Sequence, residues 1–185
     1  MNNKNEQKTI KKQGVKRASK ECAYLAVFVA LVIAAQICLA FLPGVEIVTV
    51  LFVAYAFVFG ARRGMTAAVV FSLLRQLVFG FFPLVLILYL IYYPLLTLLF
   101  GVLGSRVKNP IRALGWLTLT ACVCTVCFTL IDDILTPLWY AYTAEVAKAY
   151  FLASLGVLLP QVICTALTVF FLFLPLERVF RLVKF

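Results

Sequence analysis

The side chains best suited to chemistry in this chain are a few charged and amide groups within or beside long apolar runs. They are Gln36, Glu46, Arg75, Gln76, Asp132 and Asp133. Ionisable side chains inside a membrane are energetically costly. By default they mark a functional site, in which each one pairs with another polar or charged group. We therefore expect a pocket in which Arg75 faces Glu46 or Asp132 and which holds a polar solute.

Each of these groups also has a simpler explanation. Glu46 opens an apolar run, where a helix dipole favours an acid. Arg75 lies near the end of its run and could extend toward the membrane surface. The aspartate pair could be the solvated end of a helix. Trp139 and Tyr140 follow that pair and are typical of interfacial anchoring, or alternatively of a lid that stacks on a flat ligand.

The elements that position these groups follow from composition. The chain has 185 residues, of which 65% are hydrophobic and 13% charged, and its mean hydropathy is +1.08. No soluble domain of this length can bury so much apolar surface. The runs are apolar on all sides, which excludes the alternating pattern of a membrane β-barrel. The spans are predicted at about 22–42, 46–60, 64–80, 83–104, 112–136 and 150–175.

The predicted fold is an all-α integral membrane protein with six transmembrane helices, forming one domain over 22–185. A basic tail over 1–21 precedes it, which we expect to be disordered or to lie on the lipid surface. Lysine and arginine gather in that tail, at 62–63, at 106–112 and at 178–184, which are alternate connections. The positive-inside rule then places both termini in the cytoplasm.

The same distribution explains the net charge of +10 by topology, so no nucleic-acid partner is expected. The chain contains no histidine, which weighs against histidine-ligated metal sites and histidine acid–base catalysis. Cys122, Cys124 and Cys127 cannot converge on one helix face, so we read them as small apolar residues. We expect neither a metal nor a cofactor.

The first run carries a stripe of small residues, Ala26, Ala30 and Ala34, at a spacing of four. Such a stripe allows close approach of another helix. The partner helix could belong to this chain or to a second membrane subunit.

Together these features resemble the substrate-binding S component of energy-coupling factor (ECF) vitamin transporters. The resemblance rests on the alanine stripe, on F-L-P-G-V-E-I-V-T at 41–49, on F-V-F-G-A-R-R-G-M at 57–65 and on L-V-F-G-F-F-P at 77–83. It implies a six-helix bundle in a bacterial plasma membrane that captures a water-soluble vitamin or related micronutrient at the outer face.

The resemblance further implies that Ala26, Ala30 and Ala34 dock a transmembrane T component. Two cytoplasmic ATPases would then drive toppling of the chain in the membrane. The chain has no Gly-x-x-x-x-Gly-Lys-Ser/Thr loop, so the ATPase activity must come from a partner. The charged groups expected near the outer membrane face are more acidic than basic, which favours a cationic or zwitterionic solute over a polyanion. The acids are Glu46, Asp132, Asp133 and Glu145, and the bases are Arg75 and Lys148.

Two other functions stay open. One is a self-contained small permease or a membrane scaffold. The other is an intramembrane lipid-modifying enzyme that uses Asp132, Asp133 and Arg75. Adjacent carboxylates diverge by about 100° on a helix, which disfavours a shared metal. We therefore expect a binding protein and not an enzyme.

Overall fold

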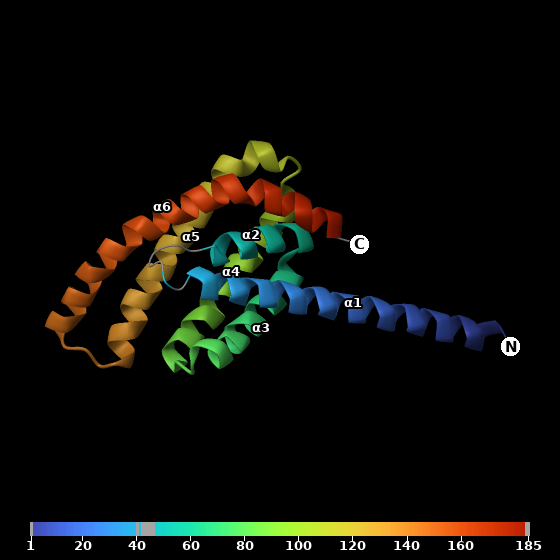
Figure 1. Cartoon of the computed structure of the whole chain (residues 1–185), viewed down its shortest axis with the longest axis horizontal. Coiled ribbons are helices and arrows are strands. Elements are labelled where there is room, and N and C mark those ends of the chain that lie inside the picture. The colour runs from blue at the N-terminus through green and yellow to red at the C-terminus, as the bar shows by residue number, and fades with distance from the viewer. Residues whose placement is uncertain (1, 40, 42–46, 184–185) are drawn as a thin grey trace.

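The computed structural model describes the backbone of residues 2–39, 41 and 47–183, and the side chains of these residues from Ser19 onward. This part of the chain forms six α-helices and no strand (Figure 1). The helices are α1 (Asn2–Leu39), α2 (Val48–Phe59), α3 (Ala61–Phe79), α4 (Pro83–Arg106), α5 (Pro110–Trp139) and α6 (Ala144–Val183). The all-α prediction is confirmed, and each predicted run corresponds to one helix.

Helix α2 is the centre of the bundle. Every residue from Val48 to Val58 is buried, because α1, α3, α4 and α6 all pack against this one short helix. A helix that is apolar on all sides is stable only when it is enclosed in this way. The α2 side chains therefore form most of the hydrophobic core, together with residues such as Phe71, Phe100 and Phe173.

Glycine residues allow the short connections at the two ends of α3. Gly60 joins α2 to α3 with φ 89° and ψ 167°, and Gly80 precedes α4 with φ 95° and ψ 158°. Residues that carry a Cβ rarely adopt this backbone conformation. On α4, a Cβ added at Gly101 would lie 2.2 Å from the backbone nitrogen of Ala61. Helix α4 therefore packs directly against the backbone at the α2–α3 turn.

Among the described residues, four helices are long and apolar enough to cross a membrane: α1 from Ser19 to Leu39, α4, α5 and α6. This number indicates a multi-pass membrane protein. Helix α2 is apolar but has only 12 residues, or about 18 Å at 1.5 Å per residue, against a hydrocarbon layer of about 30 Å. Helix α3 has 19 residues but contains three arginines. Complete crossing by α2 and α3 stays a prediction.

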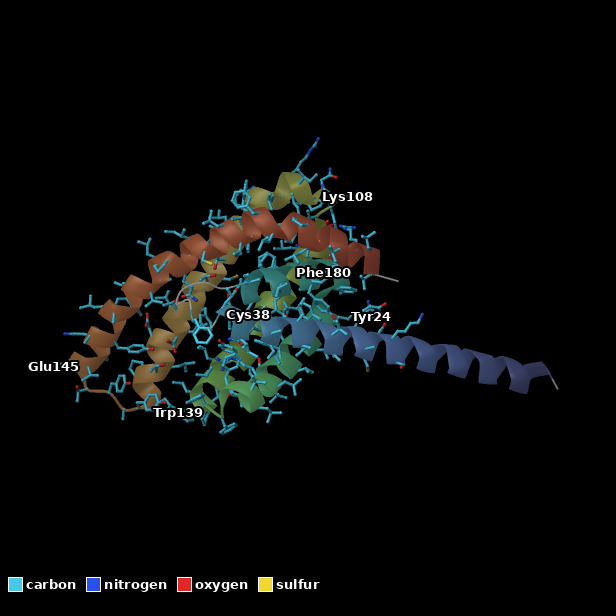
Figure 2. All side chains as sticks on the ribbon, in the orientation of Figure 1. Tyr24, Cys38, Lys108, Trp139, Glu145 and Phe180 are labelled. Carbon is cyan, nitrogen blue, oxygen red and sulfur yellow. The ribbon has the colours of Figure 1, made fainter. Side chains whose placement is uncertain are left out.

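The connections alternate between two ends of the molecule. In Figure 1 the N-terminus, the α2–α3 turn, the α4–α5 connection and the C-terminal end of α6 lie toward the right. The α3–α4 and α5–α6 connections lie toward the lower left. Figure 2 accordingly places Lys108 at the opposite end from Trp139 and Glu145. This arrangement agrees with the predicted alternation, in which the basic connections share one side.

The first helix extends beyond the span predicted at 22–42, whose counterpart in the structure is Ser19–Leu39. Helix α1 begins at Asn2 instead of about residue 22, and its N-terminal half projects beyond the bundle (Figure 1). The backbone of the basic tail is thus helical from Asn2, which differs from the disordered tail we expected as one of two possibilities; the other, a tail on the lipid surface, stays a prediction. Helix α6 is also longer than predicted, with 40 residues, and it arches over the other helices with Pro160 and Pro175 inside it.

Candidate functional site

Arg75 lies in a small polar cluster formed by three helices. Its Nε donates a hydrogen bond of 3.2 Å to Oε1 of Gln36 on α1, and the Gln36 Nε2 donates one of 3.5 Å to the Tyr89 hydroxyl on α4. The guanidinium carbon lies 4.6 Å from the ring centroid of Tyr89 and 4.8 Å from that of Phe79. Two aromatic faces and one amide therefore stabilise the cation.

This environment contains no acid that the structure describes. The ion pairs among the described side chains join Arg63 to Glu21 and Arg181 to Glu177, and neither includes Arg75. The expected pairing of Arg75 with Asp132 is therefore not present there. The alternative pairing with Glu46 lies outside the described residues. The Arg75 Nη1 is buried and has no hydrogen-bond partner in the described structure.

Gln76 faces elsewhere, because neighbouring residues on a helix point about 100° apart. Its side chain is 95% buried, and its Oε1 accepts a hydrogen bond of 2.9 Å from the backbone N–H of Phe82. That N–H lies at the start of α4, where a backbone donor has no helical partner. Gln76 thus holds the α3–α4 connection in place.

The aspartate pair lies on α5 and faces α6. The Asp132 carboxylate accepts a hydrogen bond of 2.8 Å from the Thr136 hydroxyl and another of 2.8 Å from the Tyr150 hydroxyl. Asp133 Oδ2 lies 2.8 Å from the Ser154 Oγ, while Asp133 Oδ1 is buried without a described partner. Both carboxylates are therefore held by α6, the helix that follows them in the chain, and not by Arg75.

A cavity of about 300 Å³ opens beside Asp132, and we call it the α5–α6 cavity. Oxygen-bearing side chains supply much of its wall, and Phe128, Ala153 and Val157 supply the rest. The polar lining consists of Thr129, Asp132, Tyr150, Ser154 and Gln161. Its volume falls at the small end of the range for ligand sites, about 300–1,000 Å³. It is the described cavity that best fits the predicted solute pocket.

Trp139 and Tyr140 do not line this cavity. Both are exposed at the end of α5, as expected for anchors at a membrane surface. The aromatic residue that approaches the cavity is Tyr142, whose ring packs edge-on against Tyr150 at a centroid distance of 6.1 Å. Tyr140 stacks on Tyr142 at 5.9 Å, so the loop is connected to the cavity through one intervening ring.

Phe128 connects the two polar clusters. Its ring lines the α5–α6 cavity and lies 4.6 Å from the ring of Tyr92 and 6.1 Å from that of Tyr89, measured between centroids. Tyr89 is the residue beneath the Arg75 guanidinium. The single site predicted from the sequence is thus two polar clusters on opposite sides of an aromatic wall.

Sequence reasoning missed the residues that α6 contributes. Tyr150, Ser154 and Gln161 follow the spacing of one helix face, and Thr165 continues it, with its hydroxyl 3.1 Å from that of Thr125 on α5. A polar stripe at helical spacing in an apolar run was the available signal. Hydroxyl and amide groups of this kind join membrane helices.

The alanine stripe lies on the outer surface of α1. Ala26, Ala30 and Ala34 are all exposed, while Phe28 and Val32 on the other face are buried in the core. We expected the stripe to pack against either another helix of this chain or a second membrane subunit. Within the described structure, no helix of this chain covers it. The stripe is therefore accessible to a second membrane protein.

The described residues hold no group of three or more histidine, cysteine, aspartate or glutamate side chains able to bind a metal ion. No known protein family, no characterised protein and no solved structure matches this chain. The case for a function consequently depends on the chemistry of the two clusters, the cavity and the exposed stripe.

Proposed function

We propose that this protein is the substrate-binding S component of an ECF-type importer, which captures a water-soluble vitamin or related micronutrient. The observation that carries the proposal is the α5–α6 cavity. It combines a carboxylate, an amide and three hydroxyl groups between two helices whose sequences are mainly apolar. Such groups are costly within a membrane unless they serve a polar ligand or hold helices together.

The lining also favours a class of solute. Asp132 is the charged residue of the described lining, and no basic side chain accompanies it there. A cationic or zwitterionic solute would be favoured by this carboxylate, and a polyanion would be repelled. The Phe128 and Tyr150 rings offer apolar surface to a flat heterocycle. We infer a small, positively charged or zwitterionic ring compound as the ligand.

Delivery would require partners. The exposed Ala26, Ala30 and Ala34 stripe supports docking of a transmembrane T component, because small residues let two helices approach closely. Two cytoplasmic ATPases would provide energy, since the sequence lacks a phosphate-binding loop. Toppling in the bacterial plasma membrane would then release the ligand inside. This arrangement makes the chain a binding subunit and not an enzyme.

The direct test is to purify the full chain in detergent from cells grown in rich medium, denature it, and identify the released small molecules by mass spectrometry. We expect one micronutrient near one molecule per chain. An Asp132→Asn variant should lose it, whereas Glu145→Gln, which alters an exposed acid outside the cavity, should retain it. A stoichiometric ligand retained by Asp132→Asn would place the site elsewhere.

A second test concerns the partners. Ala30→Trp should abolish co-purification with a co-expressed T component and its ATPases, because an indole on the stripe prevents close helix approach. Ala149→Trp changes an exposed alanine on α6 and should leave the complex intact. An intact complex with Ala30→Trp would count against the docking role. Solute uptake by the purified chain alone in liposomes would instead identify a self-contained permease.

A further inference from the structure

A second and larger cavity lies between α1, α2 and α3, on the side of the basic connections. Its volume is about 910 Å³, and we call it the α1–α3 groove. Figure 2 labels Tyr24, one of its wall residues, on the same side of the molecule as Lys108. The groove is therefore separate from the α5–α6 cavity, with which it shares no lining residue.

The rim of the groove is basic. Arg62 and Arg63 both line it at the start of α3, and Arg63 donates a hydrogen bond to the Glu21 carboxylate on α1. This pair neutralises Arg63 and Glu21. Arg62 is exposed and forms no ion pair with a described side chain. One full positive charge is thus left at the rim.

The interior of the groove is apolar. Val69 and Val70 lie seven and eight residues beyond Arg62 on α3, about 10–12 Å along the helix axis. Leu25 and Met65 add aliphatic surface, and three aromatic residues supply further apolar surface to the wall. These are Tyr24, Tyr55 and Phe59. A cation at one end and hydrocarbon below it match the two parts of a membrane lipid.

We propose that the α1–α3 groove binds an anionic phospholipid, with the phosphate at Arg62 and an acyl chain along Val69 and Val70. Basic pockets between helices near a membrane surface attract anionic headgroups, and the basic connections place this groove at the cytoplasmic leaflet. A free aqueous anion would have no use for the apolar interior. An uncharged lipid would leave the Arg62 charge without a partner. The proposal does not depend on the identity of the transported solute.

The test uses the full chain, stripped of endogenous lipid in detergent and then titrated with phosphatidylglycerol or phosphatidylcholine of identical acyl chains. Native mass spectrometry counts the bound lipid. We expect one phosphatidylglycerol to be retained about fivefold more tightly than phosphatidylcholine, the ratio typical of one basic residue at a membrane surface. Glycerol phosphate, which carries the headgroup charge without acyl chains, should not compete.

Two variants examine the two halves of the groove. Arg62→Gln should reduce retention of phosphatidylglycerol to that of phosphatidylcholine, while Arg112→Gln, an exposed arginine outside the groove, should not. Val69→Trp should fill the interior and lower retention of both lipids. Leu73→Trp, also exposed on α3 but outside the lining, is its control.

Each variant must elute as a monodisperse species, so that loss of lipid is not loss of fold. Equal retention of the two lipids by the unmodified chain would overturn the proposal. So would an Arg62→Gln variant that still prefers phosphatidylglycerol. Full competition by glycerol phosphate would show a site for small phosphates and not for a lipid.

Discussion

The close approach of α4 to the α2–α3 turn predicts opposite effects for two glycine-to-alanine changes. A Cβ at Gly101 would lie 2.2 Å from the backbone nitrogen of Ala61 and 2.4 Å from its Cα, where ordinary contact begins at 3.4 Å. The helices would have to separate by about 1.2 Å. A Cβ at Gly115 on α5 would have no neighbour within 4 Å.

These distances set the expected magnitudes. Alanine is favoured over glycine in a helix interior by about 1 kcal/mol. Overpacking costs about 1–3 kcal/mol, and the upper end applies here because the obstacle is backbone and not a flexible side chain. Gly101→Ala should therefore lower the free energy of unfolding by about 2 kcal/mol, or roughly 4–8 °C in Tm for a chain of this size. Gly115→Ala should raise Tm by about 2–4 °C.

The assay is thermal unfolding of the full chain in one detergent. The measured quantity is the fraction of protein that remains monodisperse after heating. Gly101→Ala and Gly115→Ala are measured together with the unmodified chain, so that the detergent affects all three equally. If Gly101→Ala proves as stable as Gly115→Ala, α4 does not pack against Ala61 at the distance described, and the position of the groove rim at the start of α3 must be revised.

Three further changes test the polar clusters by the same assay. Tyr150→Phe removes the hydroxyl that donates a hydrogen bond to Asp132 and should lower the free energy of unfolding by about 1–2 kcal/mol. Tyr142→Phe removes an exposed hydroxyl and should lower it by less than about 0.5 kcal/mol. Equal losses would contradict the hydrogen bond between Tyr150 and Asp132. Arg75→Lys should cost about 1 kcal/mol, because an ammonium cannot reach the α1 amide while lying over two rings, and an unchanged Tm would refute that geometry. Gln76→Leu should cost about 1 kcal/mol by leaving a backbone N–H at the start of α4 unpaired, and an unchanged Tm would contradict the hydrogen bond from the Phe82 N–H.

Much of the fold could be predicted because apolar runs and glycine turns are local signals. The α3–α4 connection was expected between 80 and 83, and α4 begins at Pro83 after Gly80. The ends of α1 and α6 could not be placed in this way. Polar residues beyond a span can continue the helix in water, so the apolar run shows where the membrane begins and not where the helix does.

The candidate site divides along a similar line. The height of a residue in the membrane follows from its distance to the helix end. Gln36 and Arg75 both lie in the second half of their apolar runs, and they are in contact in the structure. The neighbours of a helix do not follow from height. Asp132 lies against Tyr150 because α5 packs along α6 over most of its length, and that choice depends on the shape of both helices. Only the structure could therefore separate the two clusters.

The enclosure of α2 has a consequence for how the protein is made. Helix α2 packs against α6, which follows the other five described helices in the chain, so the core cannot close until α6 has left the ribosome. Until then the apolar side chains of α2, a helix of only 12 residues, must be covered by lipid, by α1 and α3 or by the insertion machinery. Assembly of α2 thus depends on α6, and a chain truncated before α6 would reach the membrane with one side of its central helix uncovered.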